Sequence, residues 1–226
     1  MKKKHILWGL GLLMAGGIVL GSCTKDNDNT NNSSNKTIVP IGTEDYIVDI
    51  LSIIPDSLET KFFREFGTIP EGFVPPKIEG SYKMNPKQRV SSNYPGFSTN
   101  VEEGNGVYVR FTEQINELVK LDLKEDENVE VHTDRVFVRG DGDAFVAYCV
   151  ENKKIEPVLN EVTYHVEIER AIVMKGRITS DGISDFRYAT IILDSEDDYN
   201  GVTASLEKGY YYIYKDGDGI AEKFDW

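Results

Sequence analysis

The pattern of apolar and polar positions changes once along this chain of 226 residues. From Glu44 to Gly67, apolar residues recur at spacings of three and four, the period of one helix face, and Pro55 divides this stretch. Beyond Pro76 the apolar residues alternate with polar ones, as they do from Val162 to Ile168. This alternation is typical of half-buried antiparallel strands. The sequence therefore predicts two short amphipathic helices followed by a β domain.

Turn signals that contain glycine separate the alternating runs and indicate the fold. Two of them, Gly140-Asp141-Gly142-Asp143 and Asp216-Gly217-Asp218-Gly219, contain Asp-Gly pairs, which favour hairpin turns. No helix between the runs is long enough for a parallel crossover. We expect a mainly β fold, an antiparallel up-and-down barrel of about eight to ten strands with one or two short N-terminal helices. A sandwich of two sheets would produce the same alternation.

The start of the chain has the form of a secretory signal peptide. Three lysines precede an uncharged apolar run from Ile6 to Leu20, which is shorter than the ~20 residues that a membrane-spanning helix needs. The run ends in Leu20-Gly21-Ser22-Cys23, which resembles the lipobox of bacterial lipoproteins. That resemblance implies cleavage between Ser22 and Cys23 and attachment of fatty acyl chains such as palmitate to Cys23. A signal peptide with an unrelated cysteine near its end is the alternative.

The segment after Cys23 has the composition of a tether. It is rich in Asn, Ser and Thr as far as Thr37, and such a segment cannot bury apolar surface. Thr24 follows the cysteine, and the acidic residues just beyond it resemble the export signal of surface lipoproteins in Gram-negative gut anaerobes. We expect the protein on the outer membrane, held by its lipid and facing outward, with the periplasmic face as the alternative. The expected organisation is a signal peptide over 1–22, a lipidated Cys and disordered tether over 23–43, a short helical segment over 44–75 and a barrel over 76–226.

Charge and cysteine content exclude some classes of protein. The formal net charge is −13, and removal of the signal peptide with its three lysines makes the mature chain more acidic still. Such a chain is a poor partner for nucleic acid. With Cys23 acylated, Cys149 is the one remaining thiol, so no intramolecular disulfide is expected. We expect Cys149 to be a small buried apolar residue, and a reactive thiol is the alternative.

Three glycine-containing segments resemble one family. Pro76-Lys77-Ile78-Glu79-Gly80-Ser81-Tyr82, the run from Val138 to Phe145 and the run from Gly176 to Ile183 resemble the lipocalin-like lipoproteins of gut anaerobes. The resemblance covers most of the chain from Pro76 on and implies a lipocalin-like barrel with an unassigned ligand or partner. Gly80-Ser81-Tyr82 is also similar to the Gly-x-Trp of the first lipocalin strand, which implies that Tyr82 is an aromatic residue at the base of the barrel.

The sequence lacks the motifs of metal sites and of catalysis. His132 and His165 lie at polar positions of their strands, and no His or Cys cluster has the spacing of metal ligands. Neither Asp-Gly turn has the glutamate that closes a calcium loop. We expect no metal, no cofactor and no enzymatic activity. A glycan-processing enzyme that uses paired carboxylates is the less favoured alternative.

The densest aromatic cluster is Tyr210, Tyr212 and Tyr214 with Tyr211 between them. We expect the first three to be candidate ligand-contact aromatics, because tyrosine faces stack on sugar rings and apolar ligands. One core face and one surface face on an ordinary strand is the alternative. Separately, Asp56-Ser57-Leu58 resembles a short O-glycosylation motif of exported proteins, which would place a glycan on Ser57, although a helix start explains the same residues.

The combined expectation is a lipid-anchored binding protein of the cell envelope with a lipocalin-like barrel and an unspecified ligand. Its membrane contact would run through the N-terminal lipid, and a small apolar molecule or a glycan would be its ligand. The alternative is a surface interaction or assembly lipoprotein with a solid barrel, which would contact another envelope protein.

Overall fold

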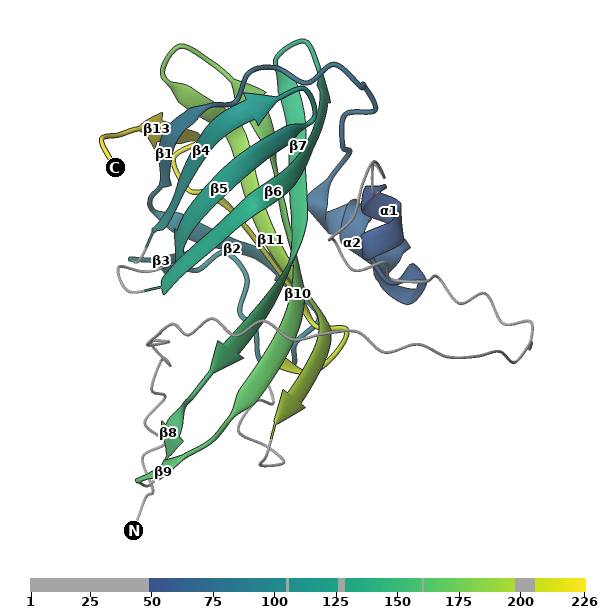
Figure 1. Cartoon of the computed structure of the whole chain (residues 1–226), viewed down its shortest axis with the longest axis vertical. Helices are drawn as coiled ribbons and strands as arrows, with labels where there is room; N and C mark the ends of the chain where they lie inside the picture. The colour runs from purple at the N-terminus through teal and green to yellow at the C-terminus, as the bar shows by residue number, and fades with distance from the viewer. Residues whose placement is uncertain (1–48, 105, 126–128, 160, 198–205) are drawn as a thin grey trace, which may run out of the picture.

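The structure is a computed structural model that describes residues 49–104, 106–125, 129–159, 161–197 and 206–226. The predicted signal peptide, lipobox and tether lie outside the described residues. Within them, two helices precede thirteen strands (Figure 1). No helix of this described part is long and apolar enough to cross a membrane.

The predicted helical segment forms two short helices, α1 (Ile50–Ile53) and α2 (Asp56–Phe66). The side chain of Asp49 accepts the backbone N–H of Leu51 and so caps α1. Helix α2 begins directly after Pro55. It carries two acidic residues in its first turn, where their negative charges interact favourably with the helix dipole. It ends at Gly67, whose positive φ of 87° stops the helix.

The strands follow the predicted alternation. They are β1 (Gly80–Met84), β2 (Lys87–Ser92), β3 (Glu102–Glu103), β4 (Val107–Ile115), β5 (Leu118–Glu125), β6 (Val129–Asp141), β7 (Ala144–Ile155), β8 (Val158–Leu159), β9 (Val162–Thr163), β10 (Val166–Ile178), β11 (Gly182–Asp197), β12 (Tyr211–Asp216) and β13 (Ile220–Lys223). The pairing of β10 with β11 has a register shift between Glu169 and Arg170, a β-bulge that breaks the alternation along β10.

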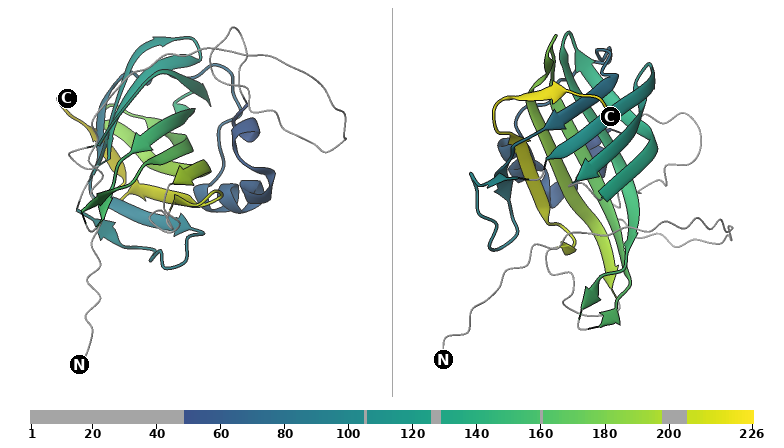
Figure 2. Two further views of the ribbon diagram at one scale, coloured as in Figure 1. Left: turned by 60° about the horizontal axis from the view of Figure 1, so that its bottom comes forward. Right: turned by 90° about the vertical axis from the view of Figure 1, so that its left-hand side faces the viewer.

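Eight strands close into an antiparallel ring, which confirms the expected mainly β barrel. Their order is β1, β4, β5, β6, β7, β10, β11 and β13. The ring closes between β13 and β1, where Lys223 lies opposite Tyr82. Figure 2 shows the strands encircling a common interior with the two helices outside it. Closure satisfies the strand edges that an open sheet would expose.

Two lines of the sheet each consist of two strands separated by a short interruption, β1 with β2 and β12 with β13. Strand β1 pairs with β13, and β2 continues the same line and pairs with β12. The predicted hairpin turn at Asp216–Gly219 is wrong, because β12 and β13 both pair with β11 and this segment interrupts one strand. The carboxylate of Asp216 accepts the backbone N–H groups of Asp218 and Gly219, at 3.1 and 3.0 Å, and holds the interruption in place. The predicted hairpin at Asp141–Asp143 is confirmed between β6 and β7.

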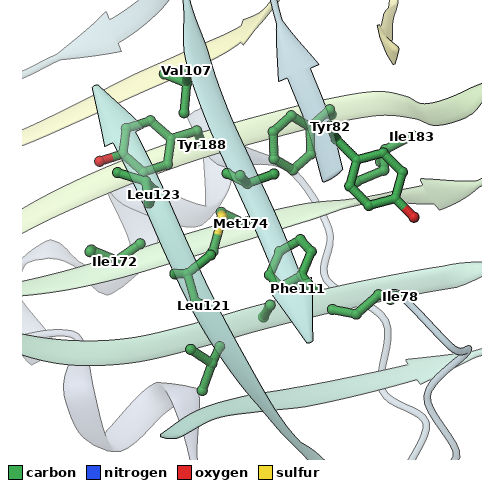
Figure 3. Packing of buried hydrophobic residues seen from close by; sticks show 14 of the residues in the cluster. Ile78, Tyr82, Val107, Phe111, Leu121, Leu123, Ile172, Met174, Ile183 and Tyr188 are labelled. Atoms are coloured by element: carbon green, nitrogen blue, oxygen red, sulfur yellow. The ribbon is translucent and has the colours of Figure 1, made fainter. Parts of the chain in front are cut away.

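Apolar side chains from every strand of the ring pack inside the barrel (Figure 3). The rings of Tyr82 and Phe111 lie 6.4 Å apart between centroids, and Phe111 meets Phe145 edge-on at the same separation. Burial of this kind supplies the main favourable term of folding. The part of the barrel interior around Tyr82, Phe111 and Phe145 is therefore filled by the protein's own side chains.

The helices cover the outer face of β7, β10, β11 and β12. Their buried residues, Ile50, Ile53, Ile54, Phe62 and Phe66, form a second apolar cluster with Tyr148, Ala171, Val173, Ile191 and Tyr211. The apolar face of the two predicted amphipathic helices thus packs against the body of the domain. Strand β12 is consequently buried on one face by α2, and its other face is turned toward the barrel interior.

Candidate functional site

The tyrosines of β12 divide between its two faces. Tyr211 is fully buried on the outer face, where its aromatic ring meets that of Phe62 edge-on with centroids 5.8 Å apart. Tyr214 packs against the interior core of the barrel and stacks on Tyr188 at 6.2 Å. Tyr212 and the preceding Tyr210 share the face of Tyr214 because side chains alternate along a strand. All three are half-buried.

Two further aromatic residues complete a cluster around these tyrosines. Tyr94 and Phe97 lie in the connection between β2 and β3. Tyr94 contacts Tyr210 and Tyr212 at centroid separations of 5.4 and 6.2 Å, and Phe97 contacts Tyr212 and Tyr214 at 5.7 and 6.1 Å. The set Tyr94, Phe97, Tyr210, Tyr212 and Tyr214 is called the aromatic cluster below.

The hydroxyls of Tyr212 and Tyr214 stay protonated over the neutral range. Burial raises the pKa of Tyr212 and Tyr214 well above the ordinary value of tyrosine, and nearby charges that include Glu103 and Glu125 raise that of Tyr214 further. A protonated phenol can both donate and accept a hydrogen bond. The cluster therefore presents apolar ring faces together with neutral polar groups.

Charged side chains of β2 and β3 border the cluster. The Nζ atom of Lys87 lies 4.8 Å from the ring centroid of Tyr214 and 2.8 Å from Oε2 of Glu103. Arg89 also pairs with Glu103 and lies over the ring of Phe97 at 5.1 Å. Burial disfavours the charged form of Glu103, yet Lys87 and Arg89 outweigh it and hold the pKa of Glu103 below its usual value.

A second group of charges, Glu125, Glu151, Lys153 and Arg170, is called the charged quartet below. Arg170 donates from Nε to Oε2 of Glu151 at 2.6 Å and from Nη1 to Oε1 of Glu125 at 3.3 Å. Because β5 and β10 are not neighbours in the barrel, Glu125 and Arg170 meet across its inside. Burial lowers the pKa of Arg170, but the two glutamates outweigh it and raise that pKa above the usual value, so Arg170 is always charged.

Strand registers place the quartet and the aromatic cluster on the same inner face. Glu151 lies opposite Arg170, and Arg170 lies opposite Ile192. The backbone of Ile192 in turn bonds to that of Tyr210. One row of residues thus runs from the quartet across β10 and β11 to the cluster.

The remaining predicted site residues lie apart from this face or inside the core. Tyr82 is buried within the barrel, and its hydroxyl donates to the carbonyl of Glu79 at 3.3 Å. Ser57 is exposed in the first turn of α2. Cys23 and its cleavage site lie outside the described residues.

The predicted burial of Cys149 is confirmed, and both histidines are exposed as their polar positions predicted. Burial raises the pKa of the Cys149 thiol to about 12. Nδ1 of His132 donates to Oδ1 of Asp122 at 2.6 Å. Among the described residues, no group of three or more His, Cys, Asp and Glu side chains is arranged to hold a metal ion.

Sequence reasoning missed Tyr94, Phe97, Lys153 and Arg170. For Arg170 a signal was present, since it lies in phase with the apolar residues Ile168 and Ile172, where a charge is unusual. Tyr94 and Phe97 flank a Pro-Gly turn and carry no periodic signal. Comparisons with protein-family models, with curated proteins and with solved structures found no match to this chain.

Proposed function

We propose that this chain is a lipid-anchored binding protein of the cell envelope that contacts its ligand through the aromatic cluster. The observation that carries the proposal is that five aromatic side chains from β12 and the β2–β3 connection converge on one inner face beside buried charges. All five are half-buried, so each side chain keeps some exposed surface. Ligand sites commonly combine apolar rings with a few placed polar groups.

The chemistry of the cluster favours a ligand that contains a ring. Tyrosine rings offer flat apolar faces with a polar tip, and they lose little conformational freedom on binding. Lys87 lies over the ring of Tyr214 and Arg89 over that of Phe97, so both cations are close enough to donate to ligand oxygens beside the cluster. A glycan or a small apolar molecule that contains an aromatic ring fits this combination, and both fall within the ligand classes considered from the sequence.

The membrane part of the proposal rests on the sequence. The segment Leu20-Gly21-Ser22-Cys23 supports acylation of Cys23, and the Asn-rich segment after it supports a tether that holds the barrel away from the bilayer. Two or more acyl chains bind a membrane stably, because each buried methylene contributes about 0.8 kcal/mol. Under this proposal the barrel acts at the outer membrane and faces outward.

A second candidate function is a surface interaction or assembly protein. The observation that favours it is the dense apolar packing inside the upper barrel, where Tyr82, Phe111 and Phe145 occupy space that a lipocalin would leave for a ligand. In that case the barrel would serve as a rigid support for contacts made from outside. The two functions differ in whether the aromatic cluster is needed.

A ligand screen with one variant tests the main proposal. Purified protein is applied to a glycan array and to a panel of aromatic small molecules, and Tyr212→Ala is compared with wild type. Tyr108→Ala is the matched control, because Tyr108 is a half-buried tyrosine on the outer side of β4 that contacts Phe224. We expect Tyr212→Ala to lose most of the binding and Tyr108→Ala to keep it. Binding that survives in Tyr212→Ala, or no binding by wild type, would overturn the proposal.

Membrane attachment is tested by Cys23→Ala. We expect the wild type to partition with membranes and into detergent, with an acylated Cys23 in the mass spectrum of the mature N-terminus. The variant should appear in the aqueous fraction. Membrane association of Cys23→Ala would contradict the lipoprotein assignment without bearing on the aromatic cluster.

A further inference from the structure

Two cations of the charged quartet lie side by side on the inner face. Arg170 is opposite Glu151 in the pairing of β7 with β10, and Lys153 is opposite the neighbouring inward residue Ile168. Lys153 and Arg170 are therefore diagonal neighbours on one face, a separation that long side chains span. Both are buried, with 5% and 8% of their surface exposed. Like charges at this separation repel more strongly in a buried site than in water.

The hydrogen bonds of these cations are incomplete. Arg170 uses Nε and Nη1 on the two glutamates, and its buried Nη2 atom has no partner within the part of the chain that the structure describes. Among the described residues, no hydrogen bond or ion pair engages the Nζ atom of Lys153. A buried donor without an acceptor costs free energy, so the Nη2 atom of Arg170 calls for an explanation.

The charge around the quartet is unusual for this protein. The chain as a whole carries a formal charge of −13, yet the quartet balances two cations against two carboxylates. Burial lowers the pKa of Lys153, and the charge of Arg170 lowers it further. An anion next to Lys153 would reverse that effect and would accept from both unused donors.

We propose that Nη2 of Arg170 and Nζ of Lys153 form a subsite for an anionic group of the ligand, a carboxylate, sulfate or phosphate. The inference rests on the proposed function and extends it, because the subsite lies on the same inner face as the aromatic cluster. The ligand would stack its ring on the tyrosines and direct its anionic group toward β7 and β10. Arginine suits planar or tetrahedral oxyanions because its donors are arranged as a fork.

Lys153→Met is the most direct test of the subsite. The change removes one unused donor and breaks no ion pair, whereas replacement of Arg170 would leave Glu125 and Glu151 without their cation. Lys154→Met is the matched control, since Lys154 is the next residue on β7 but is exposed and pairs with Glu167. Inorganic phosphate, glucuronate and uncharged glucose are titrated into each protein, and amide NMR signals of β7 and β10 report the affinity.

We expect saturable shifts with phosphate and with glucuronate in wild type and in Lys154→Met, and no shifts with glucose alone at these positions. Lys153→Met should weaken the binding by about tenfold or more, which corresponds to one charge-assisted hydrogen bond. Equal affinity in Lys153→Met, or no saturable shifts with either anion, would overturn the subsite.

Two comparisons separate the sources of the anion and the two proposals. Stronger binding of glucuronate than of phosphate would support an acidic sugar, and stronger binding of dihexanoylphosphatidylglycerol would support a lipid headgroup. Tyr212→Ala is titrated with phosphate in parallel. Phosphate binding retained in Tyr212→Ala supports the subsite even if the screen for ring ligands fails. If neither anion binds but ring ligands still bind in a manner that depends on Tyr212, the subsite is overturned and the proposed function stands.

Discussion

The aromatic rings of Phe62 in α2 and Tyr211 in β12 meet edge-on, with their planes at 90° and their centroids 5.8 Å apart. Both residues are fully buried. This contact fixes the outer face of β12, and alternation along the strand then orients Tyr210, Tyr212 and Tyr214 toward the interior. The helical segment therefore supports the aromatic cluster from behind.

Replacement of Phe62 by Ala should destabilise the fold strongly. The change removes a buried aromatic ring that also stacks on Phe66, and we expect a loss of about 3–5 kcal/mol in the free energy of unfolding. Urea denaturation measures this value, and Thr60→Ala on the exposed side of α2 should stay within about 0.5 kcal/mol of wild type. A similar loss in both variants would contradict a specific contribution of the Phe62 ring, because Ala favours the helix at both positions.

Gly182 should tolerate no side chain at the pairing of β11 with β13. A Cβ atom at this position would lie 2.1 Å from the backbone oxygen of Ala221, on the neighbouring strand β13. We expect Gly182→Ala to cost about 3 kcal/mol or more. Gly142→Ala is the comparison, because Gly142 has a φ of +61° but nothing within 4 Å of the added atom. Its cost should be about 1–2 kcal/mol, from backbone conformation alone. Equal midpoints in urea for both variants would contradict the close approach.

The side chains of His132 and Asp122 should stabilise each other only at pH values at which both are charged. The hydrogen bond to Asp122, opposed by some desolvation, raises the pKa of His132, and despite its partial burial the pKa of Asp122 is lowered by His132 and Arg110. Since the folded-state pKa of His132 exceeds the unfolded value of about 6.5, its contribution is complete below that pH and is lost as the pH rises through the folded-state pKa. Asp122 contributes above its unfolded pKa and loses the contribution in acid.

A double-mutant cycle checks this dependence. His132→Gln, Asp122→Asn and the double variant are unfolded in urea near pH 6 and near pH 9. We expect a coupling free energy at the lower pH that vanishes at the higher one. A coupling free energy that is the same at both pH values would mean that the pair interacts without the imidazolium charge.

Cys149 should be unreactive in the folded protein. Its thiol is fully buried, and burial raises the pKa to about 12, so the nucleophilic thiolate is scarce at neutral pH. Ellman's reagent should label the native protein only at the rate of unfolding and should label it at once in urea. Rapid labelling of native protein would mean that the inner face opens locally at β7.

The sequence predicted the barrel because a period of two is visible in the chain itself, whereas the details that depend on pairing were missed. Asp216–Gly219 has the composition of a hairpin turn, and only its contact with β11 on both sides shows that it interrupts a strand. Asp-Gly pairs occur both in hairpin turns and in interruptions of a strand, so composition alone cannot distinguish these two structures.

The candidate site was predicted in part, for the same reason. Alternation gave the shared face of Tyr210, Tyr212 and Tyr214, but Tyr94 and Phe97 join them from an irregular connection. Asn93, next to Tyr94, bonds to Tyr211 across 118 positions of sequence. Contacts of that range leave no local pattern, and Arg170 was visible only as a charge at an apolar position.

The closing pair of strands has a consequence for how the chain folds. Strand β1 is the first of the described strands and β13 the last, so the ring cannot close until nearly all of the barrel sequence is present. Long-range pairing of this kind slows folding, because chain entropy must be lost before the contacts form. A chain that acquires its fold late remains unfolded for longer after synthesis. Any shortening that removes β13 would leave the edges of β1 and β11 unpaired and prone to join other molecules.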